Sequence, residues 1–192
     1  MYRFLSSFLL IASSCFAGDA MSELLIDDRS SAGLVSNLGP EWRFVSDGVM
    51  GGRSAGRLTL SQRDGRDCLH LQGRVSLDNN GGFLQINLDL GRDGPLDASA
   101  YDGVELEVFG NDEDYNLHLK TSAIWLPWQS YRAGFRAPPE WRSIRLPFAE
   151  FEPYRIGKPL DPGRLERIGL VAIGRAFDAD VCLGRLALYR NP

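Results

Sequence analysis

Short segments in which apolar and polar residues strictly alternate recur along this 192-residue chain, and they constrain its fold more than any other feature. A strand turns successive side chains to opposite faces, so alternation is typical of strands with one buried and one solvated face. Parallel strands covered on both sides form continuous apolar runs instead. The pattern therefore predicts antiparallel sheets. The alternating segments are residues 57–60, 68–72, 84–90, 104–108, 116–120, 142–146 and 183–188.

We expect these strands to form an all-β, two-sheet antiparallel sandwich. The length suits a single domain over residues 18–192, and no repeat or linker divides the chain. One short helix is predicted after Asp161, which would cap it. Pro162 suits a first helical turn, and Leu165 and Ile168 lie three residues apart, as on one side of a helix.

The first 17 residues have the layout of a secretory signal peptide. A single positive charge at Arg3 precedes an apolar run too short to span a bilayer, and small residues follow. Cleavage after Ala17 is the first expectation, which places the mature protein in the periplasm or outside the cell. A lipid anchor at Cys15 is the minor alternative. No later apolar segment reaches membrane-spanning length.

The charge of the chain argues against a polyanionic partner. It has 21 basic and 25 acidic residues and a formal net charge of -4, which gives no electrostatic footprint for nucleic acid.

Two cysteines, Cys68 and Cys182, remain in the mature chain. In an oxidising compartment they could form one disulfide, but two buried thiols fit the count equally well. Both lie in predicted strands on the side away from the leucines, which favours a bridge if those strands are neighbours. A metal site at these cysteines is not expected, because no paired cysteines or nearby histidines supply further ligands.

The densest glycine segment is residues 46–54, which contain three glycines. It lacks the Gly-Lys-Ser/Thr ending and the strand-to-helix setting of a phosphate-binding loop, so nucleotide binding is rejected. A tight turn in which the aspartate bonds its own backbone is at least as good an interpretation as a site. The candidate binding residues are Ser46, Asp47, Gly48, Met50, Gly51 and Gly52.

A second glycine cluster, residues 78–83, joins two alternating segments. An Asn-Gly pair readily adopts positive φ at both central turn positions, so a hairpin turn is the first interpretation. Its candidate binding residues are Asn80, Gly81 and Gly82.

Aromatic and arginine residues are interleaved over residues 125–136. We expect Trp128, Arg132 and Arg136 on one face and Tyr131 and Phe135 on the other. Trp128 and Tyr131 are candidates for stacking on a sugar or for contacting a protein, although a packed sheet edge explains the segment equally well.

The sequence offers no catalytic constellation. His70 and His118, the two histidines, lie within strands without a nucleophile beside them. Glu105 and Glu107 share one strand face, which is usually the solvated side of a strand and only rarely a pair of glycosidase acids. We therefore expect no enzyme, no cofactor and no metal site.

Four segments, taken in order, resemble the complex I intermediate-associated protein 30 family. Trp128, Gln129, Tyr131 and residues 168–170 also suit the family, and the resemblance extends from about residue 25 to the C-terminus. The four segments are residues 46–54, 77–83, 101–106 and 141–151.

The resemblance implies a galactose-binding-like jelly roll without catalytic residues. It also implies a chaperone-like assembly factor that binds a subunit of a membrane or redox complex, with residues 46–54 and 78–83 as its functional surface. An exported member would work away from the site of complex I assembly. It is therefore expected to assist an envelope protein or, alternatively, to act as an exported carbohydrate-binding module of jelly-roll type.

Overall fold

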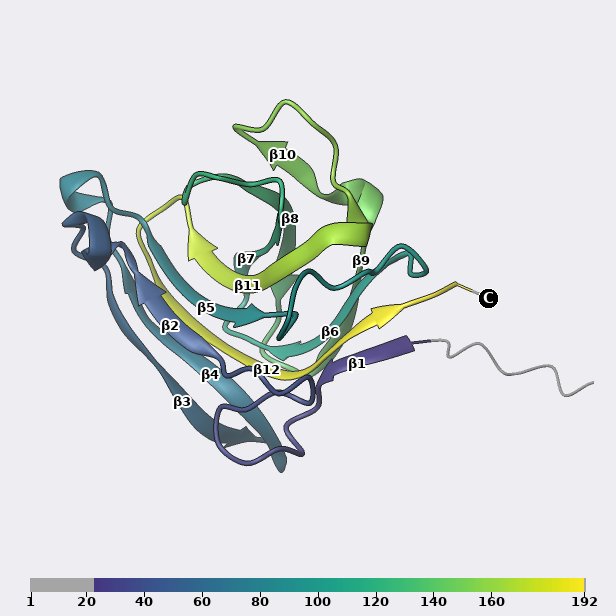
Figure 1. The fold of residues 1–192 in the computed structure, drawn as a ribbon. Coiled ribbons are helices and arrows are strands. Elements are labelled where there is room, and N and C mark those ends of the chain that lie inside the picture. The colour runs from purple at the N-terminus through teal and green to yellow at the C-terminus, as the bar shows by residue number, and fades with distance from the viewer. Residues whose placement is uncertain (1–22, 192) are drawn as a thin grey trace, which may run out of the picture.

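The computed structural model describes residues 23–191, and all of its long elements are strands (Figure 1). The predicted signal peptide, its cleavage after Ala17 and the alternative lipid anchor at Cys15 lie outside the described residues. The strands are β1 (Glu23–Asp27), β2 (Arg43–Ser46), β3 (Ala55–Arg63), β4 (Arg66–Val75), β5 (Phe83–Asp89), β6 (Gly103–Phe109), β7 (Glu113–Thr121), β8 (Ser130–Ala137), β9 (Arg142–Pro147), β10 (Glu152–Tyr154), β11 (Leu165–Ile173) and β12 (Phe177–Tyr189).

Four short 3₁₀ helices lie between these strands in the described part of the chain. They are η1 (Asp47–Met50), η2 (Asp78–Asn80), η3 (Phe148–Glu150) and η4 (Pro162–Arg164). Each is a single turn near a strand end.

The strands form two antiparallel six-stranded sheets that are stacked face to face (Figure 1). The first sheet has the order β3-β4-β12-β6-β9, with β1 paired to the second half of β12. The second sheet has the order β10-β8-β7-β11-β5-β2. The expected all-β, two-sheet antiparallel sandwich is confirmed, and every alternating segment of the sequence contributes to one of these strands.

The core lies between the sheets and takes alternate residues from most of the strands. On β7, for example, Tyr115, Leu117 and Leu119 are buried against the first sheet, while the residues between them face away from it. Burying apolar surface stabilises the fold by about 25 cal/mol per Å². The strands therefore pair in the register that keeps these apolar side chains inside.

The predicted helix after Asp161 is wrong beyond its first turn. Asp161 caps η4, with its carboxylate accepting from Gly163 N at 3.0 Å, but the chain then enters β11. The pairing of β11 with β7 shifts register between Leu165 and Arg167. This bulge puts both Leu165 and Ile168 in the core, so their three-residue spacing imitates a helix.

The predicted hairpin at residues 78–83 is also wrong. These residues form η2 and connect β4 in the first sheet to β5 in the second, so they cross between sheets. Positive φ occurs at Asn79 and Gly82, whereas Gly81 has a φ of -76°. The glycines therefore serve a crossing of the sandwich and not a two-residue turn.

Cys68 on β4 and Cys182 on β12 are joined by a disulfide between neighbouring strands, with their Cα atoms 5.4 Å apart. Both face away from the core side chains of their strands, yet both are buried. The indole ring of Trp141 packs on Gly184, two residues after Cys182, so closely that a Cβ at position 184 would collide with the ring.

Candidate functional site

The two glycine-rich segments are joined by one carboxylate, that of Asp47. This side chain is fully buried and accepts hydrogen bonds from Ser54 N at 3.0 Å and Phe83 N at 3.2 Å, and also from Ser54 Oγ and Gly82 N. Burial raises the pKa of Asp47, but these hydrogen bonds outweigh it and hold the pKa below its ordinary value. Asp47 therefore remains a carboxylate that fastens the loop after β2 to the loop before β5.

The glycines make room for that carboxylate. A Cβ at Gly52 or at Gly81 would overlap the carboxyl group of Asp47. Gly51 ends η1 in the left-handed region, with a φ of 86°, where residues with a side chain are strained. Gly48 N donates to Ser46 Oγ at 3.3 Å, which caps η1. These predicted binding residues thus have structural roles in positioning the two loops, and Asn80 lies in η2 beside them.

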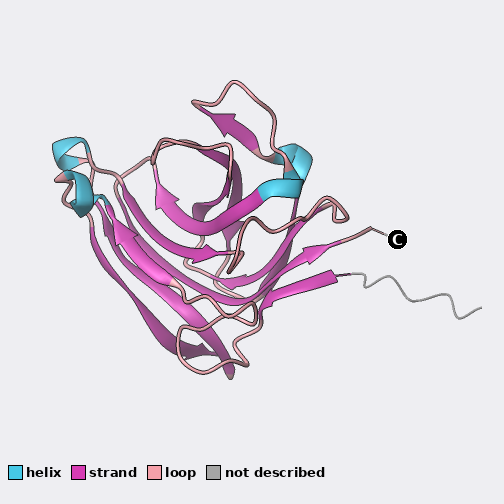
Figure 2. Cartoon of the chain, viewed as in Figure 1, coloured by secondary structure: helices cyan, strands magenta, loops and turns pink. Residues whose placement is uncertain are grey.

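Apolar side chains project from the two fastened turns, which lie side by side at one end of the sandwich (Figure 2). Val49 is 74% exposed, Met50 64% and Leu77 52%. Of these three, only Met50 was a candidate from the sequence. The three side chains are called the loop-pair surface below.

The aromatic segment continues into β8, where Tyr131 and Phe135 lie on the face opposite Arg132 and Arg136, as the alternation predicts. Its two candidate residues, Trp128 before the strand and Tyr131 within it, differ in exposure. Tyr131 is buried in the core and donates from its hydroxyl to Pro159 O at 3.1 Å, so it cannot serve as a binding ring. Trp128 is 49% exposed, and Trp125, which was not a candidate from the sequence, is 90% exposed.

The structure does not bring these rings to the loop-pair surface. The loop pair adjoins β2 and β5 at one edge of the second sheet, whereas Trp128 precedes β8 near the other edge. The register also places them at opposite ends of the sheet, since Phe83 pairs with Ile173 and Lys120 with Arg167. The sequence-predicted residues therefore belong to two separate surfaces.

A row of mostly polar residues crosses the outer face of the second sheet, the face turned away from the first sheet. The sheet is curved, with this face on the inside of the curve (Figure 1). Each residue is the pairing partner of the next, so their side chains share one line across all six strands. From β2 to β10 this polar row is Arg43, Asn87, Gly169, His118, Arg132 and Glu152.

His118 lies at the centre of the polar row and is only 7% exposed, although it faces away from the core. Its Nε2 atom has no hydrogen-bond partner. Burial, and then the positive charges of Arg132 and Lys120, lower the pKa of His118 to about 3, so the ring is neutral at neutral pH. Sequence reasoning treated this residue as structural, because the register that joins it to Arg132 cannot be read from either strand alone.

Two cations flank His118. Lys120 Nζ donates to Pro127 O at 2.6 Å, and Arg132 Nε donates to Ser130 Oγ at 2.9 Å. Neither forms a salt bridge within residues 23–191. The pKa of each is lowered, first by partial burial and then by neighbouring arginines.

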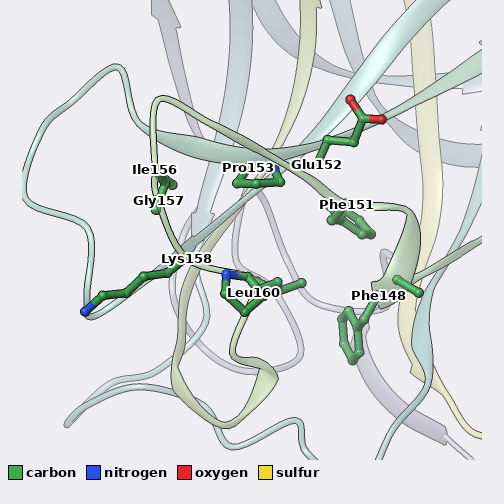
Figure 3. Close-up of a pocket in the computed structure, with 10 residues that line it drawn as sticks. Phe148, Phe151, Glu152, Pro153, Ile156, Gly157, Lys158 and Leu160 are labelled. Carbon is green, nitrogen blue, oxygen red and sulfur yellow. The ribbon is translucent and has the colours of Figure 1, made fainter.

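A pocket of about 570 Å³ lies beside β10 at the end of the polar row, and Glu152 belongs to both (Figure 3). The single segment from Phe148 to Leu160 lines it, mainly with apolar groups. Lys158 and Glu152 extend away from its centre. No group in it suggests a reaction.

Other site classes find no support in the described part of the chain. No three His, Cys, Asp or Glu side chains there gather where they could hold a metal ion. Residues 23–191 also contain no helix long and apolar enough to cross a membrane. Glu105 and Glu107, the acids weighed for catalysis, bind Arg145 and Arg66 on the outer face of the first sheet.

Residues 35–182, which include both glycine loops and most of both sheets, match the complex I intermediate-associated protein 30 family. The chain belongs to this family. The resemblance stated from the four ordered segments is thus confirmed. A comparison of the chain with curated proteins returned no match.

Solved structures similar to this family member are jelly-roll carbohydrate-binding modules. The family 11 module of a cellulosomal cellulase of Clostridium thermocellum has a TM-score of 0.70 at 12% identity, over 88% of this chain and 95% of that one. A family 11 module from the same organism, in complex with a β-1,3-1,4-mixed-linked tetrasaccharide, has a TM-score of 0.69 at 12% identity and the same coverage.

A family 30 module of another Clostridium thermocellum cellulase has a TM-score of 0.59 at 12% identity, over 88% of this chain and 97% of that one. At such identities the likeness shows the fold alone: a galactose-binding-like jelly roll.

Proposed function

We propose that this member of the complex I intermediate-associated protein 30 family is a non-enzymatic interaction or assembly factor. Its partner is an apolar segment of a membrane protein or redox-complex subunit in the cell envelope. The observation that carries the proposal is the loop-pair surface, Val49, Met50 and Leu77, held out on two turns that share the buried Asp47 carboxylate. Exposed apolar side chains that gather at one place are typical of protein contacts.

Rigidity of the loop pair supports this role. Ser76 N donates to Ser54 Oγ at 2.9 Å, and Ser54 Oγ in turn donates to the Asp47 carboxylate, so the loops are tied at their bases as well. A surface that is already ordered loses little conformational entropy when a partner binds. The family match, which includes these loops, points in the same direction.

We further propose that the protein acts in the periplasm or outside the cell. The leader sequence and the disulfide between Cys68 and Cys182 support export, because disulfides persist in oxidising compartments. A lipid anchor at Cys15 remains the minor alternative.

Site-specific photocrosslinking in the native host tests the interaction. A benzoylphenylalanine in place of Met50 is expected to form a defined adduct with one envelope protein, whereas the same probe at Leu60 is not. Leu60 is the matched control, because it is 54% exposed on β3 away from the loops. The double variant Val49→Ser, Met50→Ser should reduce co-purification of that protein about tenfold, and Leu60→Ser should not. Equal recovery with both variants would contradict the proposal.

A second candidate function, glycan binding, is favoured by Trp125 and Trp128. Both rings are exposed in the loop between β7 and β8, at one end of the second sheet. Exposed indoles suit stacking on sugar rings. The tetrasaccharide-bound structure with the same fold supports this candidate, but only through the shared fold.

A further inference from the structure

We propose that the outer face of the second sheet binds an acidic glycan, a sugar chain that carries carboxylates. This inference rests on the second candidate function, glycan binding, and names the ligand class. It assigns the site to Lys120, Arg132 and His118 on the sheet, with Trp128 and Tyr154 beside them.

Uncompensated positive charge on this face is the first argument. Lys120 and Arg132 are partly desolvated, which lowers the pKa of each, and no carboxylate in the described part of the chain pairs with either of them. Other cations of the same sheet are paired: Arg43 and Arg167 both bind Asp89. Partial burial of a charge without a partner is unfavourable, and an incoming carboxylate would satisfy both cations.

The enclosure of the polar row is the second argument. On an ordinary solvated sheet face, polar residues are exposed, whereas here His118 is 7% and Asn87 8% exposed. The Nε2 atom of His118 has no partner, although most buried polar atoms in proteins have one. A neutral imidazole in this position can exchange a hydrogen bond with a sugar hydroxyl.

Contacts between the cations and the aromatic rings are the third argument. Lys120 Nζ donates to Pro127 O, the carbonyl next to Trp128. The guanidinium carbon of Arg132 lies 3.5 Å from the centre of the Tyr154 ring. Gln129 Nε2 donates to Arg155 O at 2.8 Å, which ties the Trp128 loop to the end of β10. These contacts hold the exposed Trp128 loop and the two cations together on one surface.

Because residue 169 is a glycine, no side chain of β11 rises from the middle of this face. A Cβ there would collide with the side-chain amides of Gln85 and Asn87, which lie across it. These amides continue the hydrogen-bonding surface from His118 toward β2. A site that spans the five strands from β10 to β5 suits an extended chain of sugars better than a single anion.

Binding measurements with defined polymers test the proposal. The purified mature protein is titrated calorimetrically with polygalacturonate, alginate, neutral mixed-linked β-glucan and poly-L-glutamate, in low and in moderate salt. We expect binding to a uronate polymer and not to the neutral glucan, with weaker binding at the higher salt because exposed charges are screened.

Charge and ring variants then locate the site. Lys120→Met and Arg132→Gln should each weaken uronate binding about tenfold, as loss of a charge-assisted hydrogen bond does, and Trp128→Ala should weaken it as well. Arg136→Gln is the matched control, because Arg136 lies on the same face of β8 but is paired with Asp112 and Asp114. It should bind as the wild type does. Circular dichroism confirms that each variant is folded.

Three results would overturn the inference. The first is that the neutral glucan binds as tightly as the uronate polymers, and that this binding is lost in Trp128→Ala but kept in the charge variants. Glycan binding would then stand, and the acidic ligand class would be wrong. Equal binding of poly-L-glutamate that does not depend on Trp128 would assign the face to an acidic peptide. No binding of any polymer would remove both the inference and the glycan-binding candidate.

Discussion

Asp47 shows how one buried side chain can organise two loops that are far apart in sequence. We expect Asp47→Ala to lower the free energy of unfolding by about 3 kcal/mol, because four donors in the two loops would lose a charged acceptor. Urea denaturation measures this loss. Asp78→Ala, at an exposed position of the neighbouring turn, is the control and should change stability by less than about 0.5 kcal/mol. Similar losses in the two variants would contradict the central role of Asp47.

His118 predicts a pH dependence of stability. Burial and the charges of Arg132 and Lys120 lower its pKa in the folded protein from 6.5 to about 3. Between these values the unfolded chain binds a proton that the folded protein excludes, so the stability present above pH 6.5 is lost as the pH falls. Between pH 7.5 and 4.5 the wild type should lose about 2 to 3 kcal/mol more than His118→Gln does. Urea denaturation at both pH values checks this, and equal losses would show that the imidazole is accessible to protons.

At the scale of secondary structure elements, the disulfide between Cys68 and Cys182 fastens β4 to β12 over a sequence separation of 114 residues. Closing so long a loop restricts the unfolded chain, so the double variant Cys68→Ser, Cys182→Ser should lose about 2 to 4 kcal/mol of stability. Both sulfur atoms are buried, so a reductant should act quickly only in the presence of denaturant. Calorimetric unfolding with and without reductant measures the effect. An unchanged unfolding temperature after reduction would contradict it.

At the scale of the whole molecule, export and the disulfide make a joint prediction about the mature protein. We expect the protein recovered from its own host to begin at Gly18, and its intact mass to rise on reduction by the two hydrogens of the released thiols. Mass spectrometry with N-terminal sequencing measures both. A lipid-modified chain that begins at Cys15 would establish the anchored alternative. An unprocessed N-terminus would contradict export and place the protein in the cytoplasm.

The sequence by itself determined seven of the strands, the side chains that share a face in each of them, and the family. Alternation is a local property, so the common face of Leu117 and Leu119 can be predicted from their own segment, without knowing which strands lie beside it. The same rule correctly separated Tyr131 and Phe135 from Arg132 and Arg136 on β8. It could not say that the face of Tyr131 is the buried one, because that depends on which sheet covers it.

Only the tertiary structure decided how distant strands meet. The bulge after Leu165, the crossing of residues 78–83 between sheets and the fastening of two glycine loops by Asp47 all depend on pairing partners elsewhere in the chain. The polar row from Arg43 to Glu152 likewise exists only once six strands are set in order and register. A strand encodes the direction of its side chains locally, but its neighbours are chosen by the packing of the complete core.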